Sequence, residues 1–294
     1  MSNGKKNILL VGGAGYLGSH LKELLSLYNV FYTSRTKKPG AIELDLLKKE
    51  TFDNIASVPY DLIILLASSL KGLGTSELDA AYLDTDTTGL SGFLQFISVN
   101  KLSSKLIYVS SMTVYGKKDR LPVKEDAVPE PISTYGLSKV LGETIFGFYC
   151  NSGAARGVIL RIPGIYGGQR KSGFIYNTAM KCAGNEPLEM DTSGLGYWET
   201  IHIHDLSTWI SEFIRNYTWE ENINTFNIGY GIKTDFIECA GLIRTMLESS
   251  SEIQVRGAKG YTDFYLDNSK IKKYASVTDN YQASLKNYLK GFRS

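Results

Sequence analysis

Residues 8–25 read ILLVGGAGYLGSHLKELL, in which an apolar run leads through a glycine-rich turn into an amphipathic stretch. This order predicts a β-strand, a tight turn and an α-helix. Glycines at positions 12, 15 and 18 allow positive φ in the turn and let a pyrophosphate approach the helix N-terminus, where negative charge is favoured. The alternative is a glycine-rich turn that binds nothing. We expect a dinucleotide to contact Gly12, Gly15, Tyr16, Leu17 and Gly18.

Similar apolar runs recur at residues 30–33, 41–44, 62–66, 106–110 and 157–161, separated by helix-like stretches such as residues 18–28 and 87–99. Continuous apolar runs of this length are typical of strands that are buried on both faces of a parallel sheet. The alternation therefore predicts an α/β fold with a doubly wound parallel sheet of the Rossmann type.

The alternation changes after Arg161, where a glycine-rich and polar stretch follows, and it returns at residues 201–214 and 225–228. We therefore expect residues 1–165 with 201–232 to form a dinucleotide-binding domain. Residues 166–200 with 233–294 are expected to form a smaller, discontinuous substrate-binding lobe and the C-terminal elements.

The composition is that of an ordinary globular protein, with 294 residues, 43% hydrophobic and 21% charged, and a formal net charge of +2. It lacks the basic excess of nucleic-acid-binding proteins, so we predict no nucleic-acid partner. The three cysteines have neither paired nor histidine-linked spacing, and His202 and His204 are assigned to an alternating strand, so we predict no disulfide framework and no metal site. No apolar run approaches membrane-spanning length and no apolar leader precedes the first strand. The expected location is the cytoplasm, with no membrane partner.

The end of the second predicted strand bears on the choice of dinucleotide. An acidic residue there would bind the adenosine ribose 2′-hydroxyl and favour NAD. The chain instead has Ser34 and Arg35, followed by Lys37 and Lys38. A hydroxyl and a guanidinium suit a 2′-phosphate, so we predict NADP (NADPH) rather than NAD. The alternative is a solvated basic loop.

Tyr135 and Lys139 are four residues apart in a predicted helix and therefore share a face. A free tyrosine, with a pKa of about 10, is a poor base near neutral pH, and a nearby ammonium favours the phenolate. Ser111 ends a predicted strand and can hold a substrate oxygen beside the tyrosine. The three residues predict proton transfer at Tyr135.

With these motifs the chain resembles the extended short-chain dehydrogenase/reductase family, in its branch of nucleotide-sugar epimerases, dehydratases and 4-ketoreductases. Asp45 with Leu46 resembles the family's adenine-contacting pair, and Ala67-Ser68-Ser69 resembles its turn beneath the nicotinamide ribose. Residues 160–167, which include Pro163, are similar to the strand and loop that lead into the substrate lobe, and residues 201–205 resemble the segment that returns from it.

The resemblance implies a catalytic triad of Ser111, Tyr135 and Lys139, in which Lys139 also binds the nicotinamide ribose. It implies further cofactor contacts at Asp45, Leu46, Ala67, Ser68, Tyr135 and Pro163, and substrate contacts at Ser69, Ser111 and Thr113. A nucleotide sugar is the implied substrate, and a homodimer is common among relatives.

Departures from the family pattern narrow the expected reaction. Dehydratases carry an Asp-Glu pair where this chain has Met112 and Thr113. Combined epimerase-reductases carry a cysteine at the second of these positions and a histidine after the Tyr-Gly of the lobe-entry loop, and both are missing here. We therefore predict NADPH-dependent reduction of a nucleotide-activated keto sugar, above all a 4-keto-6-deoxy sugar. The alternatives are a nucleotide-sugar 4-epimerase with bound NAD and a non-catalytic NAD(P)-binding sensor.

Two more departures concern charged positions. Asp86 stands where the family has an asparagine, and Trp198 with Glu199 occupies the region of its diphosphate-binding arginine. Other cations would then bind the diphosphate, namely Arg170 and Arg256, with Lys171 and Lys259 as further candidates. Each of these could equally be an ordinary surface charge.

Overall fold

The computed structural model describes residues 4–69, 76–191, 196–257, 261–278 and 280–292. The chain forms two compact units. The first contains the described residues up to Gly116 together with Val128–Ile162 and Ile210–Phe226. The second contains Lys117–Ala127, Pro163–Trp209 and the described residues from Asn227 onward. The domain boundaries expected from the sequence stay a prediction.

A seven-stranded sheet forms the centre of the first unit, in the strand order β11-β6-β5-β4-β1-β2-β3. In this order the strands are Ile223–Asn227, Arg156–Ile162, Lys105–Ser111, Leu62–Leu65, Asn7–Val11, Asn29–Ser34 and Ile42–Glu43. Every neighbouring pair from β6 to β3 is parallel. The strand order reverses between β1 and β4, where α/β sheets commonly bind ligands beyond the carboxyl ends of their strands. The predicted α/β fold with a parallel sheet is confirmed.

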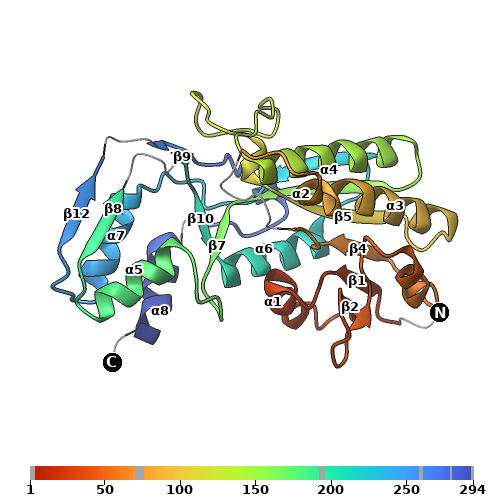
Figure 1. Cartoon of the computed structure of the whole chain (residues 1–294). Helices are drawn as coiled ribbons and strands as arrows, with labels where there is room; N and C mark the ends of the chain where they lie inside the picture. Colours follow the sequence, from red (N-terminus) through yellow and green to blue (C-terminus); the bar gives the residue numbers. More distant parts are fainter. Residues whose placement is uncertain (1–3, 70–75, 192–195, 258–260, 279, 293–294) are drawn as a thin grey trace. The chain divides into compact units, whose positions relative to one another are not determined.

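Helices cover both faces of this sheet (Figure 1). Helices α3 (Leu90–Val99) and α4 (Thr134–Asn151) run side by side on one face, and α1 (Tyr16–Leu24) lies on the other. The four residues Ile8 to Val11 of β1 are at most 1% exposed, which explains why the first strand is apolar at every position. Shorter elements join the strands to the helices, namely η1 (Lys49–Ile55), α2 (Ala80–Leu83), η2 (Thr85–Gly89) and η3 (Met112–Val114).

The main hydrophobic core of the first unit lies between the sheet and helices α3 and α4. Alternate residues of β1 and β5, such as Leu9, Val11 and Tyr108, pack in one buried cluster with Phe93 and Phe146 of the two helices. This core holds α4, which carries Tyr135 and Lys139, against β5, which ends at Ser111.

The predicted helix boundaries were partly wrong. The helix expected at residues 87–99 begins as an α-helix only at Leu90, because Thr85–Gly89 forms a wider π-helical turn, with the amide of Gly89 donating to the carbonyl of Asp84 at 2.9 Å. The helix expected from residue 18 begins at Tyr16 and ends at Leu24. The strand assigned to both His202 and His204 ends at His202, and His204 lies in α6 (Ile203–Asn216).

The described residues of the second unit form short strand pairs, the first part of α6 and the helices named below. The strands pair in parallel as β7 (Gly164–Tyr166) with β10 (Thr200–His202), β8 (Leu188–Asp191) with β12 (Ile253–Arg256), and β9 (Gly196–Tyr197) with β13 (Tyr261–Thr262). The helices are α5 (Phe174–Ala183), α7 (Phe236–Met246) and α8 (Tyr281–Leu289), with η4 (Ile271–Lys273) and η5 (Lys290–Phe292) as single turns. Phe174, Trp198 and Phe236 form an aromatic cluster with ring centroids 4.6 to 5.5 Å apart, so these aromatics pack against one another.

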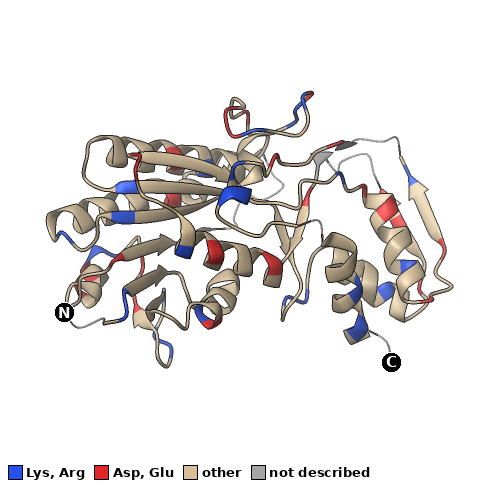
Figure 2. Cartoon of the chain, turned by 180° about the vertical axis from the view of Figure 1, so that it is seen from behind, with Lys and Arg blue, Asp and Glu red and all other residues tan. Residues whose placement is uncertain are grey.

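Both units contain charges of either sign and buried free thiols. Figure 2 shows Lys and Arg positions interspersed with Asp and Glu positions in both units. Cys150, Cys182 and Cys239 are free thiols, and all three are buried. No helix among the described residues is long and apolar enough to cross a membrane.

Candidate functional site

The glycine-rich turn lies at the carboxyl end of β1 and is shaped by close backbone approach. Gly12 has a φ of +80°, and a Cβ atom built on it would lie 2.9 Å from the backbone of Ala67. A Cβ atom on Gly18 would lie 2.4 Å from the Cα atom of Gly13. Only glycine fits these positions without displacement, and the turn packs directly against the end of β4 as a result.

The start of α1 suits an anionic ligand. Its N-cap is Gly15, which has no side chain to bind the first amides, and its first turn contains no acidic residue. Tyr16, Leu17 and Gly18 form that turn. Exposed amides at a helix N-terminus favour a phosphate group. These residues therefore fit the pyrophosphate of a dinucleotide.

The residues predicted to contact the adenosine half lie around β2 and β3. Ser34 ends β2 and is 6% exposed, whereas Arg35 is exposed in the following turn. Lys37 and Lys38 line a cavity of about 630 Å³ together with Pro39, Ala41, Glu43 and Asn54. Asp45 accepts a hydrogen bond from the amide of Leu47 at 3.0 Å, and Leu46 is part of the hydrophobic core.

The proposed triad lies at the junction of β5 and α4. Ser111 ends β5, and its Oγ atom accepts a hydrogen bond from the amide of Thr113 at 3.2 Å. Tyr135 lies in the first turn of α4, which Ser133 caps by accepting from the amide of Gly136 at 3.1 Å. A Cβ atom on Gly136 would lie 2.6 Å from the carbonyl oxygen of Thr113. The glycine therefore lets the helix that carries Tyr135 pack against the turn that begins at Ser111.

Lys139 is buried behind Tyr135 and forms an ion pair that sequence reasoning missed. Its Nζ atom lies 5.9 Å from the centroid of the Tyr135 ring and 3.0 Å from Oδ1 of Asp86, with both charged side chains 2% exposed. Asp86 was singled out only as a departure from the family pattern. The missing information was the partner, which is 53 residues away.

A second buried cluster, which sequence reasoning also missed, lies one helical turn further along α4. Arg161 of β6 donates to Glu143 at 2.7 Å from Nη2 and at 2.9 Å from Nε. It also donates to the Tyr115 hydroxyl at 2.9 Å, and Ser110 donates to Glu143 at 2.5 Å. The i,i+4 spacing of residues 135, 139 and 143 was the available signal, because it places all three on one helix face.

Ala67, Ser68 and Ser69 follow β4, next to the glycine-rich turn. The amide of Leu66 donates to the carbonyl of Val11 at 2.9 Å, which joins the ends of β4 and β1. Ser68 donates from its hydroxyl to Asp86 at 3.0 Å. The structure thus brings these small residues together with the network around Lys139.

The remaining predicted contacts belong to the second unit. Pro163 follows β6, and Arg170 donates to the carbonyl of Ile165 at 2.9 Å and to the Ser172 hydroxyl at 3.3 Å. Arg256 pairs with Glu189 at 3.3 Å on the surface of β12 and β8. Lys171 is exposed, and Lys259 lies outside the described residues. The ring of His202 packs against that of Tyr166, with the ring centroids 5.2 Å apart. Among the described residues there is no group of three side chains that could hold a metal ion.

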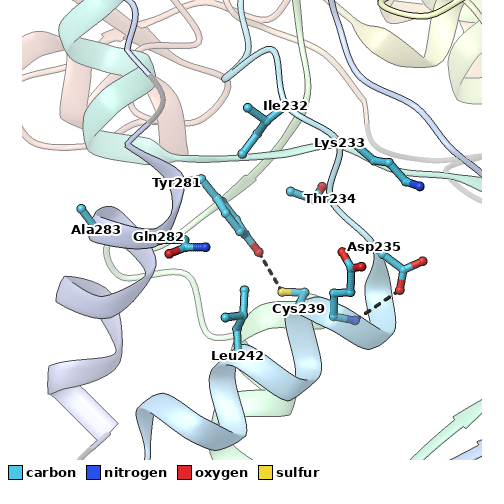
Figure 3. Close-up of a pocket in the computed structure, with 10 residues that line it drawn as sticks. Ile232, Lys233, Thr234, Asp235, Cys239, Leu242, Tyr281, Gln282 and Ala283 are labelled. Carbon is cyan, nitrogen blue, oxygen red and sulfur yellow. Dashed lines mark hydrogen bonds between the residues drawn. The ribbon is translucent and has the colours of Figure 1, made fainter.

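The second unit also contains a cavity of about 620 Å³ between the start of α7 and α8 (Figure 3). The Tyr281 hydroxyl points toward the Cys239 thiol at 3.0 Å. Asp235 and Glu238 lie at this cavity with Lys233, and Lys233 pairs with Asp263 at 2.9 Å. The surplus of negative charge disfavours a nucleotide diphosphate here.

Glu199, which stands in the region of the family's diphosphate-binding arginine, is buried and hydrogen-bonded to the backbone. It is 1% exposed, and its Oε2 atom accepts from the amide of Leu266 at 2.9 Å. Burial raises its pKa from 4.5 to about 8, against the opposing effect of backbone donors at residues 266, 231 and 230. The folded chain therefore keeps this carboxyl protonated over a range in which the unfolded chain ionises it.

This pKa shift predicts a pH-dependent stability. Between about pH 5 and pH 8 the unfolded state releases a proton that the folded state retains, so the free energy of unfolding should fall as the pH rises. Glu199→Gln keeps the neutral form at every pH and should flatten this fall. Melting temperatures of both proteins across this range are the measurement. Glu189→Gln, on the exposed face of β8, is the control, and an unchanged slope in Glu199→Gln would contradict the assignment.

Comparisons with known proteins identify the family of this chain. The NAD dependent epimerase/dehydratase family matches residues 8–229. A dTDP-4-dehydro-6-deoxyglucose reductase of Escherichia coli is 36% identical over 260 residues, which cover 77% of each chain. A UDP-glucose 4-epimerase of Mycoplasma genitalium is 24% identical over 85% of this chain and 84% of its own.

Solved structures show the same fold. RMD from Pseudomonas aeruginosa, in a complex with NADPH, matches with a TM-score of 0.81 and 19% identity over 98% of both chains. Other matching structures are complexes with NAD. The family is thus one of NAD(P)-dependent enzymes, and the two relatives named above are enzymes of nucleotide sugars. The chain belongs to the NAD dependent epimerase/dehydratase family, within the extended short-chain dehydrogenases/reductases.

Proposed function

We propose that this chain is an NADPH-dependent reductase of a nucleotide-activated keto sugar, with a 4-keto-6-deoxy sugar as the favoured substrate. The site around Ser111, Tyr135 and Lys139 carries the proposal. Support also comes from the Escherichia coli reductase, which is 36% identical to this chain.

The turn after Ser111 favours simple reduction over reactions that need additional acid and base groups. Met112 is 6% exposed and Thr113 is partly buried, so this turn offers a thioether and a hydroxyl. The buried carboxylates Asp86 and Glu143 already form ion pairs, Asp86 with Lys139 and Glu143 with Arg161. Elimination of water or epimerisation at a carbon beside the ketone would need a free base.

The proposed chemistry uses one proton donor. A bound nicotinamide would supply the hydride. Tyr135 donates its phenol proton to the ketone oxygen, and Ser111 donates a hydrogen bond to the same oxygen. Because Ser111 Oγ accepts from the amide of Thr113, its own proton is available for the substrate. The Lys139 ammonium offsets the charge left on Tyr135.

The preference for NADPH rests on Ser34 and Arg35. Ser34 ends β2 at the position where an acid would favour NAD, and the exposed Arg35 can pair with a 2′-phosphate. Asp45, Leu46, Ala67, Ser68 and Pro163 complete the proposed cofactor site. Ser69, Ser111 and Thr113 are the proposed contacts of the sugar, and Arg170 and Arg256 those of the diphosphate.

The outer faces of α3 and α4 support a homodimer. They line a groove of about 300 Å³ that includes Leu94, Ile145 and Tyr149. Val99 and Phe148, which also line it, are 74% and 80% exposed. A monomeric mass in sedimentation at micromolar concentration would contradict this proposal.

The test of the proposed function is an assay with purified protein, NADPH or NADH, and 4-keto-6-deoxy sugars linked to dTDP, UDP, GDP and CDP. We expect loss of NADPH with one nucleotide series and a tighter dissociation constant for NADPH than for NADH, measured by fluorescence. Protein that purifies with NAD and interconverts two sugars without added cofactor would favour the 4-epimerase, as the Mycoplasma relative suggests. Cofactor binding without turnover of any sugar would favour the non-catalytic sensor.

The cytoplasmic location stays a prediction.

A further inference from the structure

Asp86 is the centre of a buried network in the first unit. It is 1% exposed, and both of its carboxylate oxygens accept two hydrogen bonds. Oδ1 accepts from the Tyr108 hydroxyl at 2.9 Å and from Lys139 at 3.0 Å. Oδ2 accepts from Ser68 at 3.0 Å and from Ser138 at 3.2 Å. The hydrogen-bonding capacity of the carboxylate is therefore filled.

The backbone around Asp86 directs it to this position. The π-helical turn Thr85–Gly89 lies between α2 and α3, and the partners of Asp86 come from the end of β4, from β5 and from α4. A buried carboxylate with four donors from three other segments is costly to remove, because each donor would lose its partner.

Lys139 has few other neighbours that could balance its charge. Its Nζ atom lies 3.4 Å from the Tyr108 hydroxyl and 3.4 Å from the carbonyl oxygen of Val109. Burial and the adjacent Asp86 carboxylate hold the pKa of Tyr108 well above its ordinary value, so this hydroxyl stays neutral. Glu143, on the next turn of α4, binds Arg161 at 2.7 Å. Asp86 is thus the carboxylate that pairs with Lys139.

We propose that Asp86 is a positioning residue that fixes the Lys139 ammonium behind Tyr135 and offsets its charge there, thereby setting the pH range over which Tyr135 transfers its proton. An isolated ammonium 5.9 Å from the ring would strongly favour the phenolate, and a carboxylate 3.0 Å from that ammonium cancels much of its field. The proposal rests on the proposed function only in that Tyr135 is taken to be the proton donor.

Asp86→Asn removes the negative charge of residue 86 but keeps the size and shape of its side chain. The amide oxygen can still accept from Lys139 and Tyr108, and the amide nitrogen can donate to the hydroxyls of Ser68 and Ser138, which can rotate to accept. Lys139 keeps its oxygen partners, and no carboxylate charge beside it offsets the field of its ammonium. We expect the alkaline limb of the kcat profile, where Tyr135 loses the proton that it must donate, to move to lower pH by about one unit.

Ser138→Ala is the matched control, because it removes the Ser138 hydroxyl, which bonds to Asp86 at 3.2 Å and to the carbonyl oxygen of Tyr135 at 2.9 Å, and leaves both charges in place. Its pH profile should superimpose on that of the wild type, whereas that of Asp86→Asn should not. Identical profiles for wild type and Asp86→Asn would overturn the proposal and leave Asp86 with a purely structural role.

A spectroscopic titration tests the same idea without any substrate. The ultraviolet difference spectrum between each protein and its Tyr135→Phe counterpart isolates the phenolate of residue 135. We expect that phenolate to form at lower pH in Asp86→Asn, at higher pH in Lys139→Gln, and near the wild-type pH in the double variant, where the pair is again neutral. A shift in this titration without ketosugar turnover would retain the role of Asp86 and reject only the proposed function. If Asp86→Asn does not fold, Lys139→Gln against the double variant gives the same decision, and equal titrations would overturn the proposal.

Discussion

Tyr135→Phe is expected to lower kcat for ketosugar reduction by about 10²–10⁴-fold, the usual contribution of a positioned general acid. Tyr135 lies in the first turn of α4, and phenylalanine keeps its ring while it removes the proton that the ketone oxygen receives. Binding of NADPH should change by less than about threefold, because phenylalanine keeps the ring of residue 135 and the other expected cofactor contacts, such as the glycine-rich turn and Ser34, are untouched.

Steady-state rates with the substrate found in the ketosugar assay, together with fluorescence titration of NADPH, measure this effect. Tyr149→Phe is the control, because it makes the same change further along α4 and should leave kcat near the wild-type value. A Tyr135→Phe enzyme with more than half of the wild-type kcat would reject Tyr135 as the proton donor.

Arg161→Met is expected to lower the free energy of unfolding by about 3–5 kcal/mol, the typical cost of leaving one member of a buried ion pair without its partner. Arg161 and Glu143 are 7% and 8% exposed, so water does not replace the lost bonds. The Tyr115 hydroxyl also loses its guanidinium donor. The expected loss is large compared with that from most single substitutions.

Urea unfolding gives the free energies of unfolding of the wild type, of Arg161→Met and of the double variant with Glu143→Gln. The comparison shows how much of the loss comes from leaving the Glu143 charge without its partner. The double variant carries no buried charge at this position and should be more stable than Arg161→Met alone. Lys233→Met, whose pair with Asp263 is exposed, should leave the free energy of unfolding nearly unchanged. Equal stabilities of the single and double Arg161 variants would show that the charge on Glu143 does not destabilise the single variant.

The local features of the site could be predicted from the sequence because they depend on neighbouring residues. The strand, glycine-rich turn and helix at the N-terminus follow from the spacing of Gly12, Gly15 and Gly18 and from the apolar run before them. The shared face of Tyr135 and Lys139 follows from helical periodicity. Both predictions concern positions within about one or two helical turns.

The buried ion pairs could not be predicted in the same way. Asp86 and Lys139 are 53 residues apart, and Glu143 and Arg161 come from a helix and a strand. A charged residue in a single sequence is usually solvated, and only the packing of η2, β5, β6 and α4 shows which charges are enclosed. The π-helical turn before Leu90 was missed for a related reason, since the residues from 87 onward fit an ordinary helical period.

The burial of the three cysteines makes each of them a reporter of local opening. Burial raises the pKa of Cys150 and of Cys239 to about 12 and also raises that of Cys182, and the thiolate is the form that attacks alkylating reagents. Labelling at each cysteine therefore requires the surrounding structure to open first. Cys150 lies in the first unit and the other two in the second, so mass spectrometry of a slow alkylation reaction would time the opening of each unit separately within one intact, unmodified protein.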